Sequence, residues 1–366
     1  MSFAASGSKG DKREPGTSPA PVRRRRLPDE AGIFAVLVTV VVALSFISPS
    51  FRTVSNGFVL LVNGTVIMFL ALGQAFVLLT GGIDLSTGAN IAMTGVIAAL
   101  LMSLGVPWPI AAALAVAIGT LLGLINGALV HFLRIPPFIA TFSTQGVALA
   151  VPLIITGAQS ISVRDMGFRW IGQGKVFGLP APVILVLVAA IAAGLFLRMT
   201  RQGVHIYALG GNKAAARLSG VNVGRTTLLV YAVSGFCAGM GGLIATSRLM
   251  VGFPATGTGN ELFYSIAAAV VGGVSLFGGV GTVQGAMIGA VLIAVVSNGM
   301  NVINVQSYWQ SLVIGVIILL GVTFDTYRRS QESKSLQHRA AAQPTRQPIG
   351  PLSALPGDHA KPGRSA

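Results

Sequence analysis

Long runs of apolar residues follow one another along almost the whole chain, from Ala31 to Thr323. Most of them hold roughly 18 or more residues, which is enough for a helix to cross about 30 Å of hydrocarbon. The pattern predicts an all-α polytopic membrane protein with about ten transmembrane helices, some of them broken at glycine-rich segments. The predicted spans are about Ala31–Ser48, Phe58–Leu79, Ala89–Leu104, Trp108–Phe132, Pro136–Thr156, Ala181–Leu197, Thr226–Ser247, Leu262–Leu276, Val283–Met300 and Ser307–Thr323.

The composition agrees with a bilayer environment. Hydrophobic residues make up 53% of the chain and charged residues only 10%, whereas soluble domains carry about 25% charge. The net charge of +15 does not indicate nucleic-acid binding, because the basic residues lie in tails and short connections rather than along a groove with aromatic partners. Cys237 is the only cysteine, and the four histidines show no metal-ligand spacing, so we expect no disulfide, metal or cofactor.

The basic residues also predict the orientation, because cytoplasmic loops retain Lys and Arg. With ten crossings and the amino terminus inside, the inside segments hold seven in the N-terminal tail, one at Arg134, five between Arg198 and Arg225, and seven in the C-terminal tail. Only five remain outside: Arg52, Arg164, Arg169, Lys175 and Arg248. We therefore expect both termini in the cytoplasm.

The chain divides into a membrane domain and two tails. Residues 1–30 form a basic tail with a run of four arginines from Arg23, and residues 326–366 are rich in Gln, Ser, Ala and Pro. Both compositions are typical of disordered cytoplasmic segments. Residues 31–325 are the expected membrane domain.

A carboxylate lies in a glycine-rich interruption between two predicted spans. Residues 80–88 read Thr-Gly-Gly-Ile-Asp-Leu-Ser-Thr-Gly, where a continuous helix is not expected. Asp84, Ser86 and Thr87 are the groups that can satisfy the free NH groups of such a break. Asp84 either caps and anchors the next helix or contacts the substrate or gate of a membrane pathway.

Uncharged polar residues are scattered through the other spans. Such groups suit the hydroxyls of a neutral substrate, and they suit helix–helix hydrogen bonds equally well. The candidates are Asn63, Gln74, Asn126, Thr141, Gln145, Gln284, Asn298 and Asn301. The spans lack the set of ionisable residues expected of a carrier coupled to protons or sodium.

The chain has no Gly-x-x-x-x-Gly-Lys-[Ser/Thr] loop, so active transport would need energy from a partner. The longest inside loop, about residues 207–220, is the candidate contact with that partner. Asn212 can cap a short helix there, an alanine run can propagate it, and Gly220 can end it. A short helix lying along the membrane surface is the alternative.

Three blocks resemble the ribose/xylose/galactose-type permeases of ABC sugar importers: residues 81–86, residues 208–220, and residues 272–279 with 281–285. The resemblance covers about Phe58 to Asp325. It departs from the family at Val280, where such permeases commonly carry Arg, and at residues 263–265, where an acidic residue often precedes Ile-Ala-Ala.

The resemblance implies a multi-pass permease of the bacterial inner membrane that is not itself an enzyme. Its implied partners are a second permease subunit, a cytoplasmic ATPase with two nucleotide-binding cassettes, and an extracytoplasmic sugar-binding protein. It also implies that the 207–220 loop is the coupling segment seated on the ATPase. The residues expected to make that contact are Gly210, Gly211, Asn212, Ala215, Arg217, Leu218 and Gly220.

Other functions remain open at this point. Importers of branched-chain amino acids or nucleosides share the glycine-rich block near residues 272–289. A channel or facilitator that works without ATP would not need the 207–220 loop. A membrane enzyme would need a cluster of reactive side chains, and the only carboxylates near the membrane core are Asp84, Glu261 and, at its edge, Asp325.

Overall fold

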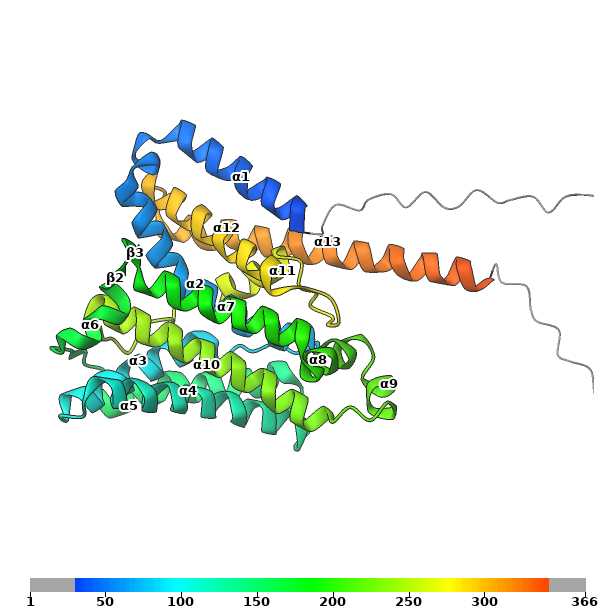
Figure 1. The fold of residues 1–366 in the computed structure, drawn as a ribbon, viewed down its shortest axis with the longest axis horizontal. Coiled ribbons are helices and arrows are strands. Elements are labelled where there is room, and N and C mark those ends of the chain that lie inside the picture. Colours follow the sequence, from blue (N-terminus) through cyan, green and yellow to red (C-terminus); the bar gives the residue numbers. More distant parts are fainter. Residues whose placement is uncertain (1–29, 342–366) are drawn as a thin grey trace, which may run out of the picture.

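The computed structural model describes residues 30–341, which form a bundle of helices with two short strand pairs (Figure 1). Every predicted span forms a helix. These helices are α1 (Glu30–Ile47), α2 (Val54–Leu79), α3 (Thr87–Ser103), α4 (Trp108–His131), α5 (Pro137–Thr156), α7 (Ala181–Met199), α10 (Val223–Leu249), α11 (Glu261–Val271), α12 (Val283–Val302) and α13 (Ser307–Ala341).

Seven helices of the described chain are long and apolar enough to cross a membrane. They are α2, α4, α5, α7, α10, α12 and the part of α13 from Tyr308 to Tyr327. Ala31–Ile47 of α1, α3 and α11 are shorter apolar helices. An all-α polytopic membrane protein is therefore confirmed, whereas the number of crossings stays a prediction.

Helix α2 lies at the centre of the bundle, in contact with α7, α10, α11 and α12. All its residues from Gly64 to Leu79 are buried. Helix α10 packs against α2, α3 and α4. The two long helices α2 and α10 therefore form the core to which the shorter elements attach.

The glycines Gly119, Gly123 and Gly127, spaced four residues apart on α4, form a close contact with α10. A Cβ on Gly123 would lie 3.1 Å from Cα of Gly235, and one on Gly127 would lie 2.9 Å from Cα of Leu228. Side chains at these positions would separate the two backbones. In a second set of glycines with this spacing, Gly285 and Gly289 pack against the end of α11, whereas Gly281 lies before α12 and packs on Val274.

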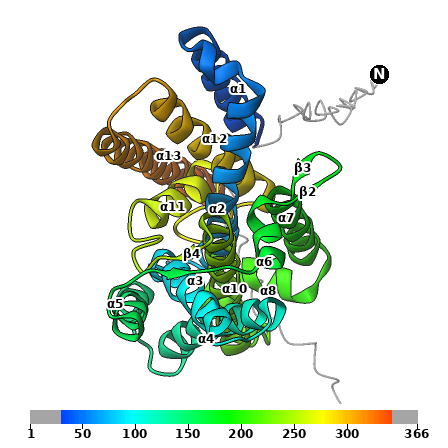
Figure 2. The same ribbon diagram turned by 90° about the vertical axis from the view of Figure 1, so that its left-hand side faces the viewer.

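Helices α3 and α11 are both preceded by non-helical chain. Helix α2 ends at Leu79 and α3 begins at Thr87, so the predicted break is confirmed. Residues 253–260 separate α10 and strand β4 (Val251–Gly252) from α11. Helix α11 ends at Val271, earlier than the predicted span, because Gly273 turns the chain with a φ of +85°. Figure 2 shows α11 between α13 and α3.

Several elements were not expected from the sequence. The connection between α5 and α7 contains α6 (Met166–Gln173), strand β1 (Ile161–Ser162) paired with β4, and a hairpin of β2 (Lys175–Val176) and β3 (Leu179–Pro180). A 3-10 turn (Pro49–Arg52) joins α1 to α2. Helix α13 continues to Ala341, past the predicted domain boundary at Asp325. The tail segments 1–29 and 342–366 lie outside the described residues.

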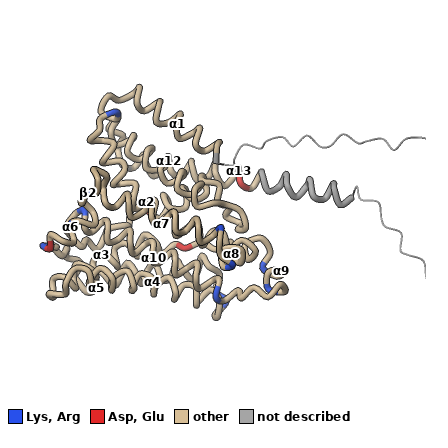
Figure 3. Tube along the Cα trace, in the orientation of Figure 1, with Lys and Arg blue, Asp and Glu red and all other residues tan. Residues whose placement is uncertain are grey.

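The two ends of the bundle differ in their elements. One carries α6 and the β2–β3 hairpin, and is called here the α6 end. The other carries α8 (Arg201–Gly211) and α9 (Lys213–Leu218), and is called the α8–α9 end. Figure 3 shows Lys and Arg gathered around α8 and α9, with a smaller group at the α6 end.

Candidate functional site

Asp84 is held in the break between α2 and α3 by three hydrogen bonds. Its Oδ1 accepts from the Ser86 backbone NH at 2.9 Å and from the Ser86 hydroxyl at 2.6 Å. Its Oδ2 accepts from the Ser234 hydroxyl of α10 at 2.7 Å. The carboxyl is fully enclosed, since Asp84 is 1% exposed. Because both oxygens of this enclosed group are engaged, these contacts fix the break against α10.

The contacts of Asp84 continue into α4 and α5. Asn126 donates to the Ser86 hydroxyl at 2.9 Å, and the Thr144 hydroxyl donates to Asn126 Oδ1 at 2.5 Å. The Ile83 carbonyl accepts from the Thr141 hydroxyl at 3.3 Å. One buried network therefore ties the break to three helices that are distant in sequence.

Asn90 of α3 makes a second link between helices. Its side-chain NH2 donates to the Gly119 carbonyl of α4 at 3.1 Å and to the Gly235 carbonyl of α10 at 3.3 Å. Sequence reasoning did not select Asn90 or Ser234. One sequence feature could have identified Asn90 as a site residue: it lies one helical turn after Ser86 and so on the same face of α3. No such feature identifies Ser234, because no local sequence pattern relates it to Asp84.

The structure brings together only part of the predicted polar set. Asp84, Asn126 and Thr141 belong to the network, and Gln145 is half-buried on α5 next to Thr144. Gln74 is fully buried in α2, and both its side-chain polar atoms lack a partner among the described residues.

The remaining predicted polar residues lie elsewhere. Asn63 accepts a hydrogen bond from Arg248. Asn298 exchanges two hydrogen bonds with Asn56, of 3.0 and 3.1 Å. Gln284 is exposed on α12. The Asn63 contact links α2 to α10 and the Asn298 contact links α12 to α2, and none of the three residues joins the Asp84 network.

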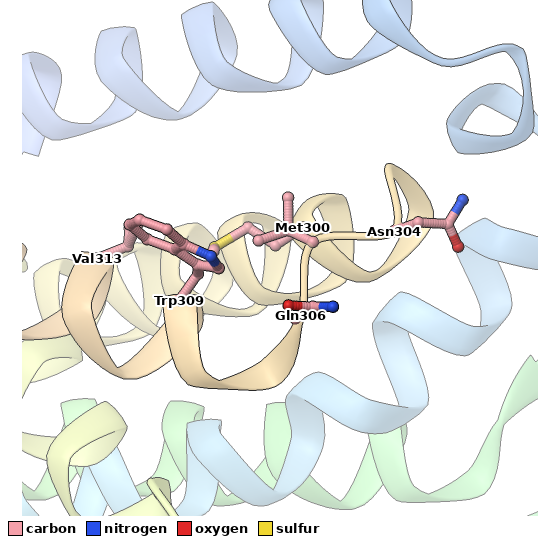
Figure 4. A pocket seen from close by; sticks show the side chains of 6 residues that line it. Met300, Asn304, Gln306, Trp309 and Val313 are labelled. Carbon is pink, nitrogen blue, oxygen red and sulfur yellow. The ribbon is translucent and has the colours of Figure 1, made fainter.

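Asn301 belongs to a separate polar group at the turn between α12 and α13, where it accepts from Gln310 at 2.6 Å. A cavity of about 470 Å³ lies beside this turn. The lining residues come from the ends of the two helices and from the turn between them (Figure 4), and they are Met300, Asn304, Val305, Gln306, Trp309 and Val313. Trp309 is half-exposed, as expected for an aromatic anchor at the edge of a membrane.

The predicted coupling segment forms α9 and the end of α8. Asn212 caps α9, as its side-chain oxygen accepts from the Ala215 NH at 3.0 Å. Gly220 has a φ of +83° and ends the segment. The predicted cap and stop are therefore confirmed. Arg217 and Leu218 are exposed, with Leu218 90% exposed, so α9 presents an unpartnered surface in this chain.

Gly210 contacts two glycine-rich segments that are far away in sequence. A Cβ at Gly210 would overlap the Leu79 carbonyl at the end of α2 and would lie 3.0 Å from the Gly278 carbonyl carbon. The Gly279 NH donates to that same Leu79 carbonyl at 2.9 Å. Cβ atoms at Gly278 and Gly279 would lie 2.9 Å from backbone atoms of Gly210 and Gly211. We call this contact of Gly81, Gly210, Gly211, Gly278 and Gly279 the glycine junction.

A tyrosine hydrogen bond reinforces the glycine junction. The Tyr207 hydroxyl of α8 donates to the Gly281 carbonyl at 2.9 Å. Burial raises the pKa of Tyr207 above its usual value, so the hydroxyl stays protonated and able to donate. The three sequence blocks of the resemblance therefore meet at one place in the fold.

Known protein families and curated proteins resemble this chain over most of its length. A protein-family model described as the permease component of branched-chain amino acid transport systems matches residues 56–322. The ribose import permease RbsC of Escherichia coli K12 is 38% identical over 83% of this chain and 95% of its own. The D-allose permease AlsC of the same organism is 38% identical over 81% and 91%.

A third curated relative has a related description. The galactose/methyl galactoside import permease MglC of Escherichia coli K12 is 35% identical, over 83% of this chain and 96% of its own. No solved structure matches the chain.

Proposed function

Because the chain belongs to the family of membrane permease subunits of ABC importers, we propose that it forms the pathway by which a simple sugar crosses the bacterial inner membrane. Permease subunits of this family are not enzymes, and ATP hydrolysis lies in a separate subunit. The observation that carries the proposal is the 38% identity to the ribose import permease over 83% of the chain.

The proposed orientation places the α8–α9 end and both termini in the cytoplasm. The basic residues of α8, α9 and the flanking connections support it (Figure 3), since cytoplasmic loops retain Lys and Arg. The α6 end then faces the extracytoplasmic sugar-binding protein. All ten apolar helices are taken to be membrane elements, with α3 and α11 crossing only part of the bilayer.

The coupling segment is proposed to dock on the ATPase and to move the break that contains Asp84. The exposed surface of α9 supplies the docking contact. The glycine junction supplies the transmission, because backbones in direct contact have no flexible side chains between them to absorb a displacement. A movement of α8 would then reach the end of α2 and the turn before α12 together.

A second permease subunit is proposed to close the pathway, as a copy of this chain or a related one. Asp84 is proposed to act as an anchor for the break rather than as a substrate contact. Its three hydrogen bonds support this assignment, since both carboxylate oxygens are engaged and enclosed.

One observation favours a second candidate function. The matching family model is described for branched-chain amino acid transport, so leucine, isoleucine and valine are the competing substrates. The curated relatives named above are described for sugars instead.

Uptake into vesicles tests the proposal. The chain is assembled with its cognate ATPase and binding protein, and ATP-driven uptake of ribose, allose, galactose, xylose and leucine is compared. We expect uptake of at least one of the sugars, and none without ATP. Uptake of leucine alone would support the second candidate. Uptake that needs no ATP would indicate a facilitator.

A further inference from the structure

The chain between β4 and α11 crosses part of the bundle without forming a helix. Within residues 253–260 the backbone makes two local hydrogen bonds, from the Thr256 NH to the Phe253 carbonyl at 3.0 Å and from the Thr258 NH to the Ala255 carbonyl at 3.3 Å. We call Phe253–Asn260 the wall segment.

Its neighbours on α3 show how deep the wall segment lies. Just before it, Gly252 lies against Val96 and Ala99, and within it Gly257 lies against Gly88 and Ile91. At 1.5 Å per residue, the chain descends by about 12 Å along α3 between these two contacts. The following helix α11 has 11 residues, or about 16 Å, and so covers about half of a 30 Å hydrocarbon layer. The wall segment must occupy the other half.

The wall segment is exposed on one side of this chain. Phe253 is 47% exposed, and Ala255, Thr258 and Gly259 are exposed as well. Lipid cannot satisfy free backbone NH and carbonyl groups, so non-helical chain at this depth is tolerated only where it is buried in protein or lines a water-filled cavity. A lipid-facing position is therefore excluded on energetic grounds.

A carboxylate beside the wall segment lacks a hydrogen-bond donor among the described residues. Glu261 begins α11, and its Oε2 is buried without a hydrogen-bond partner among the described residues. This oxygen lies 3.0 Å from the position of a Cβ on Gly259, so the carboxylate folds back over the wall segment. Carboxylates inside membrane proteins nearly always face a partner or a water-filled cavity.

We propose that the wall segment lines the water-filled part of the translocation pathway, and that Thr258, Asn260 and Ser311 form hydrogen bonds with the hydroxyls of an uncharged sugar as it passes. This inference rests on the proposed sugar-permease function. Ser311 of α13 donates to Asn260 Oδ1 at 3.1 Å, so these two residues already lie together at one edge of the wall segment. All three side chains can donate and accept hydrogen bonds, which matches a sugar hydroxyl.

Water access is measured first, with single cysteines in the assembled importer in membrane vesicles. The native Cys237 is buried and is replaced by Ala, and Ala255→Cys or Thr258→Cys is added. The control is Val188→Cys, in the middle of the apolar helix α7, where the side chain is 60% exposed and is taken to face lipid. The probe is a charged methanethiosulfonate reagent, which reacts with thiolates formed in water.

We expect both wall-segment cysteines to react at least tenfold faster than the control. Labelling after denaturation confirms that each thiol is present and intact. If the wall-segment cysteines react as slowly as Val188→Cys, the wall segment is not in the aqueous pathway, and the inference is overturned whatever the importer transports.

Sugar contact is measured second, through the hydroxyl of Thr258. Thr258→Val removes the hydroxyl at nearly constant volume, whereas Thr258→Ser keeps it. We expect Thr258→Val to raise the KM of uptake by up to about tenfold, because one hydrogen bond to the sugar is lost. Thr258→Ser is expected to keep a KM near that of the wild type. The Thr258 hydroxyl donates to the Ala255 carbonyl at 2.8 Å. The control is Thr39→Val, because Thr39 is an exposed helix threonine whose hydroxyl likewise donates to a backbone carbonyl, at 2.9 Å.

The two measurements separate the inference from the proposed function. Fast labelling without uptake of any sugar would keep the aqueous wall and overturn the sugar assignment. Normal uptake by Thr258→Val would overturn the proposed contact of Thr258 with the sugar.

Discussion

Ser234 and Asp84 lie 150 positions apart in the chain, and the Ser234 hydroxyl donates a 2.7 Å hydrogen bond to the Asp84 carboxylate. This bond fastens the break between α2 and α3 to the long helix α10. The position of the break therefore depends on α10 as much as on the sequence of the break itself.

Asp84→Asn is expected to keep most of the uptake, and Asp84→Leu to lower both uptake and stability. An Asn side chain keeps one oxygen for the two Ser86 donors, and its NH2 can donate to Ser234. Leu leaves the Ser86 NH and two hydroxyls without an acceptor, at about 1–3 kcal/mol for each group that stays unsatisfied. Melting in detergent and sugar uptake are measured for both variants.

The outcome also decides the role of the charge. If Asn fails as badly as Leu while the protein stays folded and assembled, the carboxylate charge is needed at the gate. Wild-type uptake and melting for Asp84→Leu would contradict both roles.

Gly210→Ala is expected to uncouple ATP hydrolysis from transport. The added methyl group would overlap the Leu79 carbonyl and the backbone at Gly279, so α8 must move away from the glycine junction. We expect uptake to fall by about tenfold or more, while ATP hydrolysis continues. The matched control is Gly211→Ala, where the methyl group would have no neighbour within 4 Å.

Uptake and ATPase activity of the same vesicle preparations check this prediction. Uptake by Gly210→Ala at the wild-type level would show that the contact carries no coupling.

Arg217→Glu is expected to weaken attachment of the ATPase without affecting membrane insertion. Arg217 is exposed on α9, and exposed substitutions usually change stability by no more than about 0.5 kcal/mol. A loss of bound ATPase on co-purification would therefore reflect docking rather than folding. Arg52→Glu, at the α6 end, is the control and should keep the ATPase bound. Full ATPase recovery and uptake with Arg217→Glu would remove this side chain from the docking surface.

Reporter fusions after Gly10 and Ala360 are expected to place both termini in the cytoplasm. Twenty of the 25 basic residues lie in segments assigned to that side, and moving them across the membrane is unfavourable. Activity of a reporter that works only in the periplasm, at either end, would falsify the ten-span orientation.

The sequence alone determined the membrane class, the position of each long helix and the break at residues 80–86. These features depend on local properties: apolar length, glycine content and the capping chemistry of residues such as Asn212. Helix α6 was missed because its 8 residues are too few for a periodic pattern to be recognised, and most of its flanking residues read as an ordinary loop.

Only the tertiary structure decided which polar and glycine residues act together. Asn126 and Gln74 are both uncharged amide residues within predicted apolar spans, yet Asn126 joins the Asp84 network and Gln74 does not. The meeting of Gly210 with Gly278 and the Leu79 carbonyl likewise depends on how α2, α8 and the turn before α12 pack. A local pattern specifies which face of a helix is apolar or small, whereas contacts between distant segments follow from the packing of whole helices against one another.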